Sequence, residues 1–287
     1  MTFENEIISC ILQYNPDAEI RNETGIACRT VHVNDKNLAF CILPVPFDGL
    51  QDISATFFQE QTLEYAAQGV QLVHLWQDCW LTKKEIVRSR IAVLSGSFVR
   101  IHARQTETWR ISRDVMFEFF GDNHLQSFVN GRYNYGLYHE GKVVAAASFS
   151  GGRNIMRDGV KYRSFELLRY ANLLHYRVTG GMGKLITRFI HDVNPDDIMT
   201  YADLDWAPGQ GYLALNFKQT GVTPPQTFWI HPEEMRRYYP HRLPWKLIDE
   251  CRNGNMDDFL RYKGYVKIYN SGNMKYLFDC KERDINK

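Results

Sequence analysis

A cluster of glycines between a strand-like segment and an amphipathic helix most restricts what this chain can fold into. The cluster is Gly180-Gly181-Met182-Gly183-Lys184, and the apolar residues after it fall on one helical face, at Leu185, Ile186, Phe189, Ile190 and Val193. Glycines let backbone amides approach an anion without interference from Cβ. The first turn of a helix adds partial positive charge. The sequence therefore predicts an anion cradle here, to which Lys184 adds a full charge.

The standard nucleotide motifs do not match this cluster. A Walker loop requires Ser or Thr after the lysine, and Leu185 stands there. The dinucleotide pattern GxGxxG fails because Ile186 occupies its last glycine position. A short Gly-x-Gly turn instead suits the pyrophosphate of coenzyme A. The alternative is a tight strand-to-helix turn that holds no ligand.

Apolar runs and turn signals along the chain predict a mixed α/β (α+β) fold in two domains, 1–96 and 97–287. Thr82 followed by Glu85 predicts a capping box for a helix to Leu94. Alternation over 100–110 predicts one strand. Glu140-Gly141 predicts a hairpin turn between segments 133–138 and 143–149. The turn Ser271-Gly272-Asn273 predicts a closing hairpin between segments 265–269 and 274–278. Helices are also predicted at 3–12, 55–67, 114–120, 209–217, 245–251 and 256–262, and strands at 37–43, 70–76, 133–138, 143–149, 164–170, 197–202 and 227–230.

Composition argues against several partner classes. The 34 Lys and Arg residues nearly balance the 33 Asp and Glu residues, for a net charge of +1. This balance does not indicate a nucleic-acid or membrane surface. No apolar run is long enough to span a bilayer, and the acidic N-terminus does not resemble a signal peptide. We expect a cytoplasmic protein without a membrane partner. The six cysteines form no CxxC pair, so reduced thiols are expected and no metal site is predicted.

The order of elements over 99–230 resembles the GNAT acyltransferase family. That family's cradle pattern is [QR]xxGxG[AG]; Gly181 and Gly183 match its glycines, whereas Val178 and Lys184 depart from it. The segment YLALNF at 212–217 resembles the family's LYxxxGF helix, with Asn216 in place of glycine. The resemblance implies a mixed-sheet domain that uses acetyl-CoA or another acyl-CoA as co-substrate. It also implies that Tyr212 is the general acid; the alternative is an aromatic residue packed on an amphipathic helix.

Further polar residues are candidates for contact with an amine acceptor, either a small molecule or a peptide. Glu166, on the strand before the cradle, would be the base; the alternative is a Glu paired with Arg169 or solvated. Backbone amides around 167–169 would polarise the thioester carbonyl. For most of the remaining candidates the alternative is a structural role at a helix end or in a surface turn. His74 lies inside an apolar strand and is interpreted as a core histidine rather than a ligand. The predicted substrate contacts are His124, Gln126, Arg169, Asp203 and Asp205.

Several ordered blocks also resemble a family of phage and mobile-element proteins, some of which are homing-endonuclease-like. In these proteins a Vsr-like or PD-(D/E)xK-type nuclease domain precedes a GNAT-like domain. The blocks are 69–91, 123–128, 136–149, 165–170, 180–190, 194–206 and 264–278. The resemblance implies a nuclease-like first domain and a GNAT-like second domain with a C-terminal helical and hairpin extension.

The nuclease half departs from active members of that family. Those members hold a divalent metal with an Asp on one strand and a Glu a short way further along the chain, inside a strand. Here Cys41 stands near the expected Glu, and Val31 or His32 near the expected Asp. Asp35, Asp48 and Asp52 are nearby but lie in turn-like sequence. We therefore expect a degenerate nuclease-like domain.

The alternative function is a nucleic-acid-binding protein descended from a nuclease. Two basic stripes would contact phosphates, with aromatic residues of the second stacking on bases. Solvated helix faces are the other interpretation. The first stripe is Lys83, Lys84, Arg88 and Arg90, with Arg100 and Arg104; the second is Arg236, Arg237, Arg242 and Lys246, with Tyr238, Tyr239 and Trp245.

Overall fold

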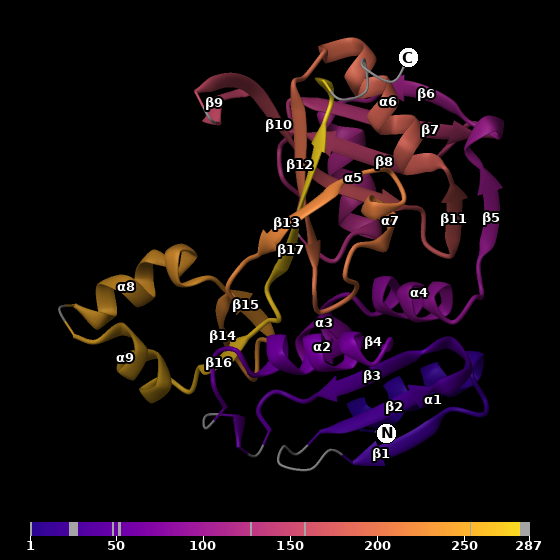
Figure 1. Ribbon diagram of the computed structural model, residues 1–287. Helices are drawn as coiled ribbons and strands as arrows, with labels where there is room; N and C mark the ends of the chain where they lie inside the picture. The colour runs from indigo at the N-terminus through magenta and orange to yellow at the C-terminus, as the bar shows by residue number, and fades with distance from the viewer. Residues whose placement is uncertain are drawn as a thin grey trace. The chain divides into compact units, whose positions relative to one another are not determined.

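The computed structural model describes residues 2–22, 28–47, 49–50, 53–126, 128–157, 159–252 and 254–281 (Figure 1). The chain forms two compact units, and each contains separate stretches of sequence. The first unit comprises Met1–Lys84, Asp203–Pro208 and Val222–Asn273, and the second comprises Glu85–Ala202, Gly209–Gly221 and Met274–Lys287. The predicted mixed α/β class is confirmed. The single predicted boundary near residue 96 does not describe these units, because much of the C-terminal third belongs to the first.

Burial explains that assignment. The core of the first unit combines Cys41 and Leu43 with Phe228, Ile230 and Ile268. These residues lie far apart in sequence, yet all are buried together. A boundary read from local turn signals could not anticipate this association.

A four-stranded sheet, in the order β1-β2-β3-β4, anchors the first unit. β3 pairs with β4 in parallel and with β2 antiparallel, and all its residues are buried, as its continuous apolar run predicts. The elements are α1 (Phe3–Tyr14), β1 (Glu19–Asn22), β2 (Arg29–Val33), η1 (Asn34–Lys36), β3 (Leu38–Leu43), α2 (Phe57–Ala67), β4 (Gln71–Trp76) and α3 (Gln77–Thr82).

A second, three-stranded sheet in this unit has the order β15-β14-β16. α8 and α9 have the predicted bounds, and Leu260 of α9 packs with Trp229 of β14 and Leu243. The elements are β14 (Thr227–His231), β15 (Arg236–Tyr238), η4 (Pro240–Arg242), α8 (Trp245–Cys251), α9 (Met256–Tyr262) and β16 (Val266–Tyr269).

The second unit is built on a large mixed sheet in the order β13-β17-β12-β10-β8-β7-β6, with β9 paired to β10. β5 (Val99–His102) and β11 (Tyr176–Thr179) form a separate parallel pair. The strands of the large sheet are β6 (Glu107–Arg110), β7 (Tyr133–His139), β8 (Lys142–Phe149), β9 (Arg153–Arg157), β10 (Val160–Asn172), β12 (Asp197–Asp203), β13 (Lys218–Val222) and β17 (Asn273–Asp279).

Helices α5 (Arg113–Asn123) and α6 (Gly181–Val193) cover opposite faces of this sheet (Figure 1). Ala146 of β8 packs with Met116 and Phe120 of α5. Phe149, three residues later and so on the other face, stacks on Phe189 of α6 with ring centroids 4.0 Å apart. The remaining helices are α4 (Lys84–Leu94) and α7 (Gln210–Leu213).

Three local predictions are wrong. The Thr82 hydroxyl donates to the Asp78 carbonyl at 2.6 Å and ends α3 instead of capping α4. The predicted strand over 100–110 is divided by η3 (Ala103–Gln105) into β5 and β6. The predicted closing hairpin is absent among the described residues, because β16 pairs with β14 whereas β17 lies between β13 and β12.

No helix within the described ranges has the length and apolar character needed to cross a membrane.

Candidate functional site

The predicted cradle begins α6. Gly180 precedes the helix in the left-handed conformation, with φ 79°, which glycine adopts without strain. The first amides of a helix have no acceptor inside it. Within the part of the chain that the structure describes, the amides of Gly181 and Gly183, in the first turn of α6, donate no backbone hydrogen bond. The Met182 amide interacts with the hydroxyl oxygen of Tyr170. Two of the three amides of the first turn are therefore available to an anion.

Packing also explains these glycines. A Cβ at Gly181 would lie 2.9 Å from Cγ1 of Val178 and 3.1 Å from the hydroxyl oxygen of Tyr170. A Cβ at Gly183 would lie 3.0 Å from Cδ2 of Leu215. The glycines let the start of α6 approach its neighbours closely. Their presence alone therefore does not identify a ligand site.

The Lys184 ammonium is bonded to η3 and Thr106 rather than being free beside the amides of Gly181 and Gly183. Its ammonium donates to the carbonyl of Ala103 at 2.9 Å and to both the carbonyl and the hydroxyl of Thr106. An ammonium has three donors, and these oxygens account for them. The role predicted for Lys184 in holding a diphosphate is therefore replaced by one in holding η3 against α6.

The centre of the sheet is interrupted beside β10. The parallel ladder between β10 and β12 ends at the pair Glu166–Met199, although both strands continue. Beyond it, the Leu167 carbonyl accepts a hydrogen bond from the Thr200 hydroxyl at 3.0 Å. On the opposite edge of β10, the register with β8 shifts between Leu167 and Arg169, which marks a β-bulge. Bulge and ladder end thus coincide.

Glu166 and Tyr212 approach this point from opposite faces of the sheet. Phe165 packs on Phe189 of α6, with ring centroids 5.4 Å apart, so the next residue, Glu166, points to the other face. Thr200 is two residues beyond Ile198, the partner of Phe165, and therefore lies on the α6 face. Tyr212 makes a side-chain hydrogen bond with Thr200 and so lies on the α6 face as well.

Glu166 is held at its backbone by Ser150. The Ser150 hydroxyl accepts from the Glu166 amide, and the Ser150 amide donates to the Glu166 carbonyl, each at 2.9 Å. The carboxylate forms an ion pair with Arg153 at 3.2 Å, where the sequence had suggested Arg169. Burial raises the pKa of Glu166, and the charges of Arg153 and Arg169 oppose this shift without cancelling it. A raised carboxyl pKa suits a general base.

Tyr212 and Tyr170 form a pair of phenols on the cradle side. Burial raises the pKa of Tyr212, against the effects of Thr200 and of the charge of Arg169. Burial also raises the pKa of Tyr170, whose hydroxyl donates to Asn172 Oδ1 at 3.0 Å. Both phenols are therefore protonated at neutral pH, as a general acid requires. Sequence analysis missed Tyr170, although it closes the FELLRY block that contains Glu166.

The short helix α7 is followed by an asparagine in the left-handed backbone conformation. α7 ends at Leu213, earlier than predicted, and Asn216 then adopts φ 65°. This left-handed conformation is the one that glycine provides most easily, and Asn tolerates it better than most residues. Asn216 therefore fills the position of the glycine in LYxxxGF. The Tyr212 ring packs against Phe217 and Tyr276 with centroids 5.5 and 5.3 Å apart.

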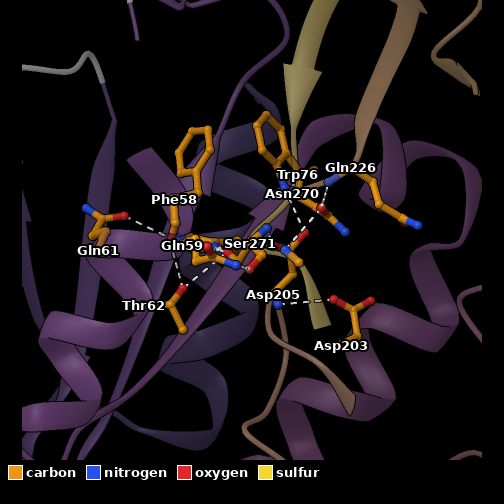
Figure 2. A network of polar contacts seen from close by, with 12 residues as sticks. Phe58, Gln59, Gln61, Thr62, Trp76, Asp203, Asp205, Gln226, Asn270 and Ser271 are labelled. Carbon is orange, nitrogen blue, oxygen red and sulfur yellow. Dashed lines mark hydrogen bonds and ion pairs between the residues drawn. The ribbon is translucent and has the colours of Figure 1, made fainter. Parts of the chain in front are cut away.

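Asp203 and Asp205 are assigned to the first unit, whereas Glu166 and Tyr212 are assigned to the second. Asp205 is buried and accepts from the Ser271 amide at 2.7 Å and from the Trp76 indole at 3.3 Å (Figure 2). Asp203 accepts from the Asp205 amide at 3.1 Å. For Asp205 the predicted contact with substrate is replaced by a structural role, whereas for Asp203 it stays a prediction. No surface carboxylate remains at Asp205 to meet an acceptor.

His74 lies in the same network as a satisfied core histidine. Its Nδ1 is 2.9 Å from the Ser271 hydroxyl and 3.5 Å from Asp205 Oδ1, and its Nε2 is 3.2 Å from Gln61 Oε1. Burial raises the pKa of Asp205, but its contacts with His74, Arg237 and the Ser271 amide outweigh this effect and leave the pKa lowered. Asp205 is therefore a buried carboxylate fixed by its partners.

His124 and Gln126 form a local turn after α5. The Gln126 amide donates to His124 Nδ1 at 3.0 Å, and the His124 ring lies against Phe120 of α5 at 5.8 Å between centroids. These contacts match the helix-end interpretation. A role in substrate binding stays a prediction for both residues.

The residues singled out by the nuclease resemblance have apolar or local surroundings. Cys41 and Val31 are fully buried, and His32 is 3.2 Å from the Thr30 hydroxyl. Across the described ranges, no group of three or more His, Cys, Asp or Glu side chains is arranged to hold a metal ion. Asp48 and Asp52 lie outside the described residues.

Several cations of the predicted basic stripes are engaged. Lys84 pairs with Glu6 at 2.6 Å, and Arg88 with Glu85 at 3.6 Å. Arg237 makes a bidentate contact with Asp78, at 2.6 and 3.0 Å. Its guanidinium also lies over the rings of Trp76 and Phe228. Arg237 is therefore a structural cation rather than a phosphate contact.

No family model matches the sequence, and no curated protein is detectably similar to it. Solved structures align with parts of it. Eis1 from Mycobacterium abscessus aligns at 12% identity over 44% of this chain and 34% of that chain, with a TM-score of 0.35. A GNAT family acetyltransferase from Elizabethkingia anophelis with acetyl-CoA bound aligns at 10% identity over 61% and 98%, with a TM-score of 0.31. A Bacillus subtilis acetyltransferase in complex with CoA aligns at 11% identity over 61% and 97%, with a TM-score of 0.34.

The aligned part spans about a third of the length of Eis1. TM-scores this low do not establish a common fold. The functional proposal therefore depends on the geometry of this chain.

Proposed function

We propose that the second unit is an N-acyltransferase that uses acetyl-CoA or another acyl-CoA as co-substrate and a small-molecule or peptide amine as acceptor. The observation that supports it most is the end of the β10–β12 ladder at Glu166–Met199, beside a β-bulge. At this point a raised-pKa carboxyl group and a protonated phenol, Tyr212, approach from opposite faces. Acyl transfer needs a base on the amine side and an acid on the thiol side.

Each group has one role in the proposed reaction. Gly181 and Gly183 would bind the diphosphate through their amides. Backbone amides of the bulge around 167–169 would donate to the acyl oxygen, where negative charge develops. Glu166 would take the proton that the amine loses as its nitrogen bonds to the acyl carbon. Tyr212 would give a proton to the sulfur as the C–S bond breaks. The acyl-CoA would supply the activated thioester.

Ligand stabilisation tests the cradle. A ligand that binds the folded state raises the melting temperature by mass action. We expect acetyl-CoA to stabilise the protein and Gly183→Glu to abolish this effect, because it places a carboxylate beside the amides. Gly183 is a better position than Gly181, where a side chain would meet Val178 at 2.9 Å. Salt-sensitive stabilisation by an oligonucleotide, with none by acetyl-CoA, would favour the nucleic-acid alternative.

Release of free thiol in the presence of a broad amine panel tests the chemistry. Tyr212→Phe removes the proposed acid and keeps the ring packing against Tyr276. We expect a loss of about a hundredfold in rate at an unchanged melting temperature. Tyr262→Phe is the matched control, because Tyr262 lies on the exposed surface of the first unit. Equal rates for the wild type and Tyr212→Phe would remove Tyr212 from the mechanism.

No observation favours nuclease chemistry or a phage origin for the first unit, and we propose neither.

A further inference from the structure

An exposed arginine is paired with the proposed base. Arg153 Nη2 lies 3.2 Å from Glu166 Oε2, and the two side chains are 67% and 21% exposed. Exposed ion pairs contribute little to stability, because water competes for both partners. This pair can therefore be exchanged for a pair with a bound molecule.

The strand register places both groups on one face of the sheet. Arg153 of β9 is paired with Ser164 of β10, so the two side chains share a face, and Glu166 lies on the same face two residues later. Tyr201 joins them, because it is two residues beyond Met199, the partner of Glu166. Its side chain is partly exposed, at 38%. Arginine, carboxylate and phenol thus lie on the face opposite α6 and Tyr212.

The other arginines near this face are committed to the protein. Arg157 forms an ion pair with Asp197, whose side chain is 0% exposed, and its guanidinium lies over the Tyr162 ring. Arg169 donates to the Leu168 carbonyl at 2.7 Å. Arg153 has the exposed Glu166 contact instead. It is the cation on this face best placed to bind an incoming anion.

We propose that Arg153 selects acceptors that carry a carboxylate next to the amine, as α-amino acids do. This inference rests on the proposed function and names its substrate class. A guanidinium and a carboxylate form strong, directional hydrogen bonds. When Arg153 turns to the acceptor carboxylate, it leaves Glu166, which is then free to take the amine proton. An amine without the carboxylate finds the base still paired.

The charged and titratable groups around Glu166 agree with this arrangement. Arg153 from β9 and Arg169 from β10 lower the pKa of Glu166, while burial raises it more strongly. Burial raises the pKa of Tyr201 in β12, the charge of Glu166 raises it further, and the charge of Arg153 lowers it. When the acceptor carboxylate draws Arg153 away from Glu166, the pKa of Glu166 rises. Glu166 is then a stronger base when the amine is bound.

Matched acceptors test the selection. Each L-amino acid is compared with its own carboxamide, in which a neutral group of similar size replaces the carboxylate. Because the carboxamide also has a less basic amine, kcat/KM is calculated from the concentration of unprotonated amine. We expect kcat/KM for acids to exceed that for amides at least about tenfold. In Arg153→Ala this ratio falls to about one, mainly through a higher KM for the acids, and Arg153→Lys restores part of it. Lys161→Ala, on the opposite face of the same hairpin, keeps the wild-type ratio. Equal use of acids and amides by the wild type, or an equal loss on both in Arg153→Ala, overturns the proposal.

A binding measurement separates this inference from the proposed function. If no amine receives an acyl group, the proposed function has failed. The melting temperature is then measured with the amino acids and with their amides, at constant ionic strength. Stabilisation by the acids alone, lost in Arg153→Ala, supports the carboxylate site without catalysis. If the acids and the amides change the melting temperature equally, the proposed carboxylate site is wrong.

Discussion

The first and second units each bring titratable side chains together from distant parts of the chain, but with opposite consequences. In the first unit, His74, Asp205 and Ser271 have the residue types of a hydrolase triad. All three are buried, and both Ser271 and Asp205 lie on the Nδ1 side of the imidazole. A proton relay needs its serine and its carboxylate on different ring nitrogens. In the second unit, Glu166 and Arg153 are partly exposed and held by a single ion pair. Exposure and exchangeable partners, not residue type, distinguish a site from a structural network.

Removal of Asp78 gives the largest expected effect and tests the structural half of this comparison. Asp78→Ala leaves the Arg237 guanidinium without the carboxylate that binds it at two atoms. Breaking one side of a buried ion pair costs about 3–5 kcal/mol. We expect the free energy of unfolding, measured with urea, to fall by this amount. Lys263→Ala, which breaks the exposed pair with Glu250, is the control and should leave the free energy of unfolding nearly unchanged.

The proposed site should show the reverse behaviour. Glu166→Gln keeps the side-chain volume and removes the base. We expect a loss of about a hundredfold or more in acyl transfer, with the melting temperature within error of the wild type. Glu140→Gln, at an exposed turn, is the matched control and should keep full activity. A large loss of stability in Glu166→Gln would place Glu166 among the structural groups.

Asp205 sharpens the comparison through pH. Its pKa is lowered in the folded protein, so it contributes stability above the pKa of an unfolded carboxyl group and loses that contribution as pH falls through the folded pKa. Asp205→Asn should therefore be less stable than the wild type at neutral pH, by about 1–3 kcal/mol. The difference should shrink on acidification. Denaturant melts at several pH values measure this, and a difference that does not change with pH would contradict it.

The pH dependence of acyl transfer gives the smallest expected effect. Glu166 must lose its proton to act, so the rate should rise with pH through its raised pKa. Because the charge of Arg153 lowers that pKa, Arg153→Ala should move the rising limb to higher pH. Profiles of kcat/KM with a carboxamide acceptor measure the shift without interference from an acceptor carboxylate. Superimposable pH profiles for the wild type and Arg153→Ala would show that Arg153 does not influence the pKa of the catalytic base.

Local signals predicted much of the fold. The turn Glu140-Gly141 joins β7 and β8, and both residues adopt positive φ, as a two-residue hairpin turn requires. α8 and α9 have their predicted bounds. The cradle glycines and the amphipathic face of α6 were also found in the sequence. Each of these features depends on a few neighbouring residues.

Features that depend on distant partners escaped prediction. The turn-like sequence at Ser271 was interpreted as a hairpin, yet Ser271 is fully buried against Phe58 and His74. The sequence around Asp205 is typical of a surface carboxylate, because its buried partners come from distant parts of the chain. The ladder end at Glu166 and the bulge in β10 have no sequence signal, because both are properties of the pairing between strands.

The interleaving of the two units has a consequence for biosynthesis. The β1–β4 sheet of the first unit precedes the second unit in the chain, but the first unit is completed by Asp203–Pro208 and Val222–Asn273, which follow most of it. During synthesis the core of the first unit therefore stays incomplete while most of the second unit is translated. Core residues such as Cys41 and Leu43 can then pack with Phe228 and Ile268 only after most of the second unit has been made. A fragment that stops at residue 96 would expose that apolar surface, so the two units are best produced as one uninterrupted polypeptide.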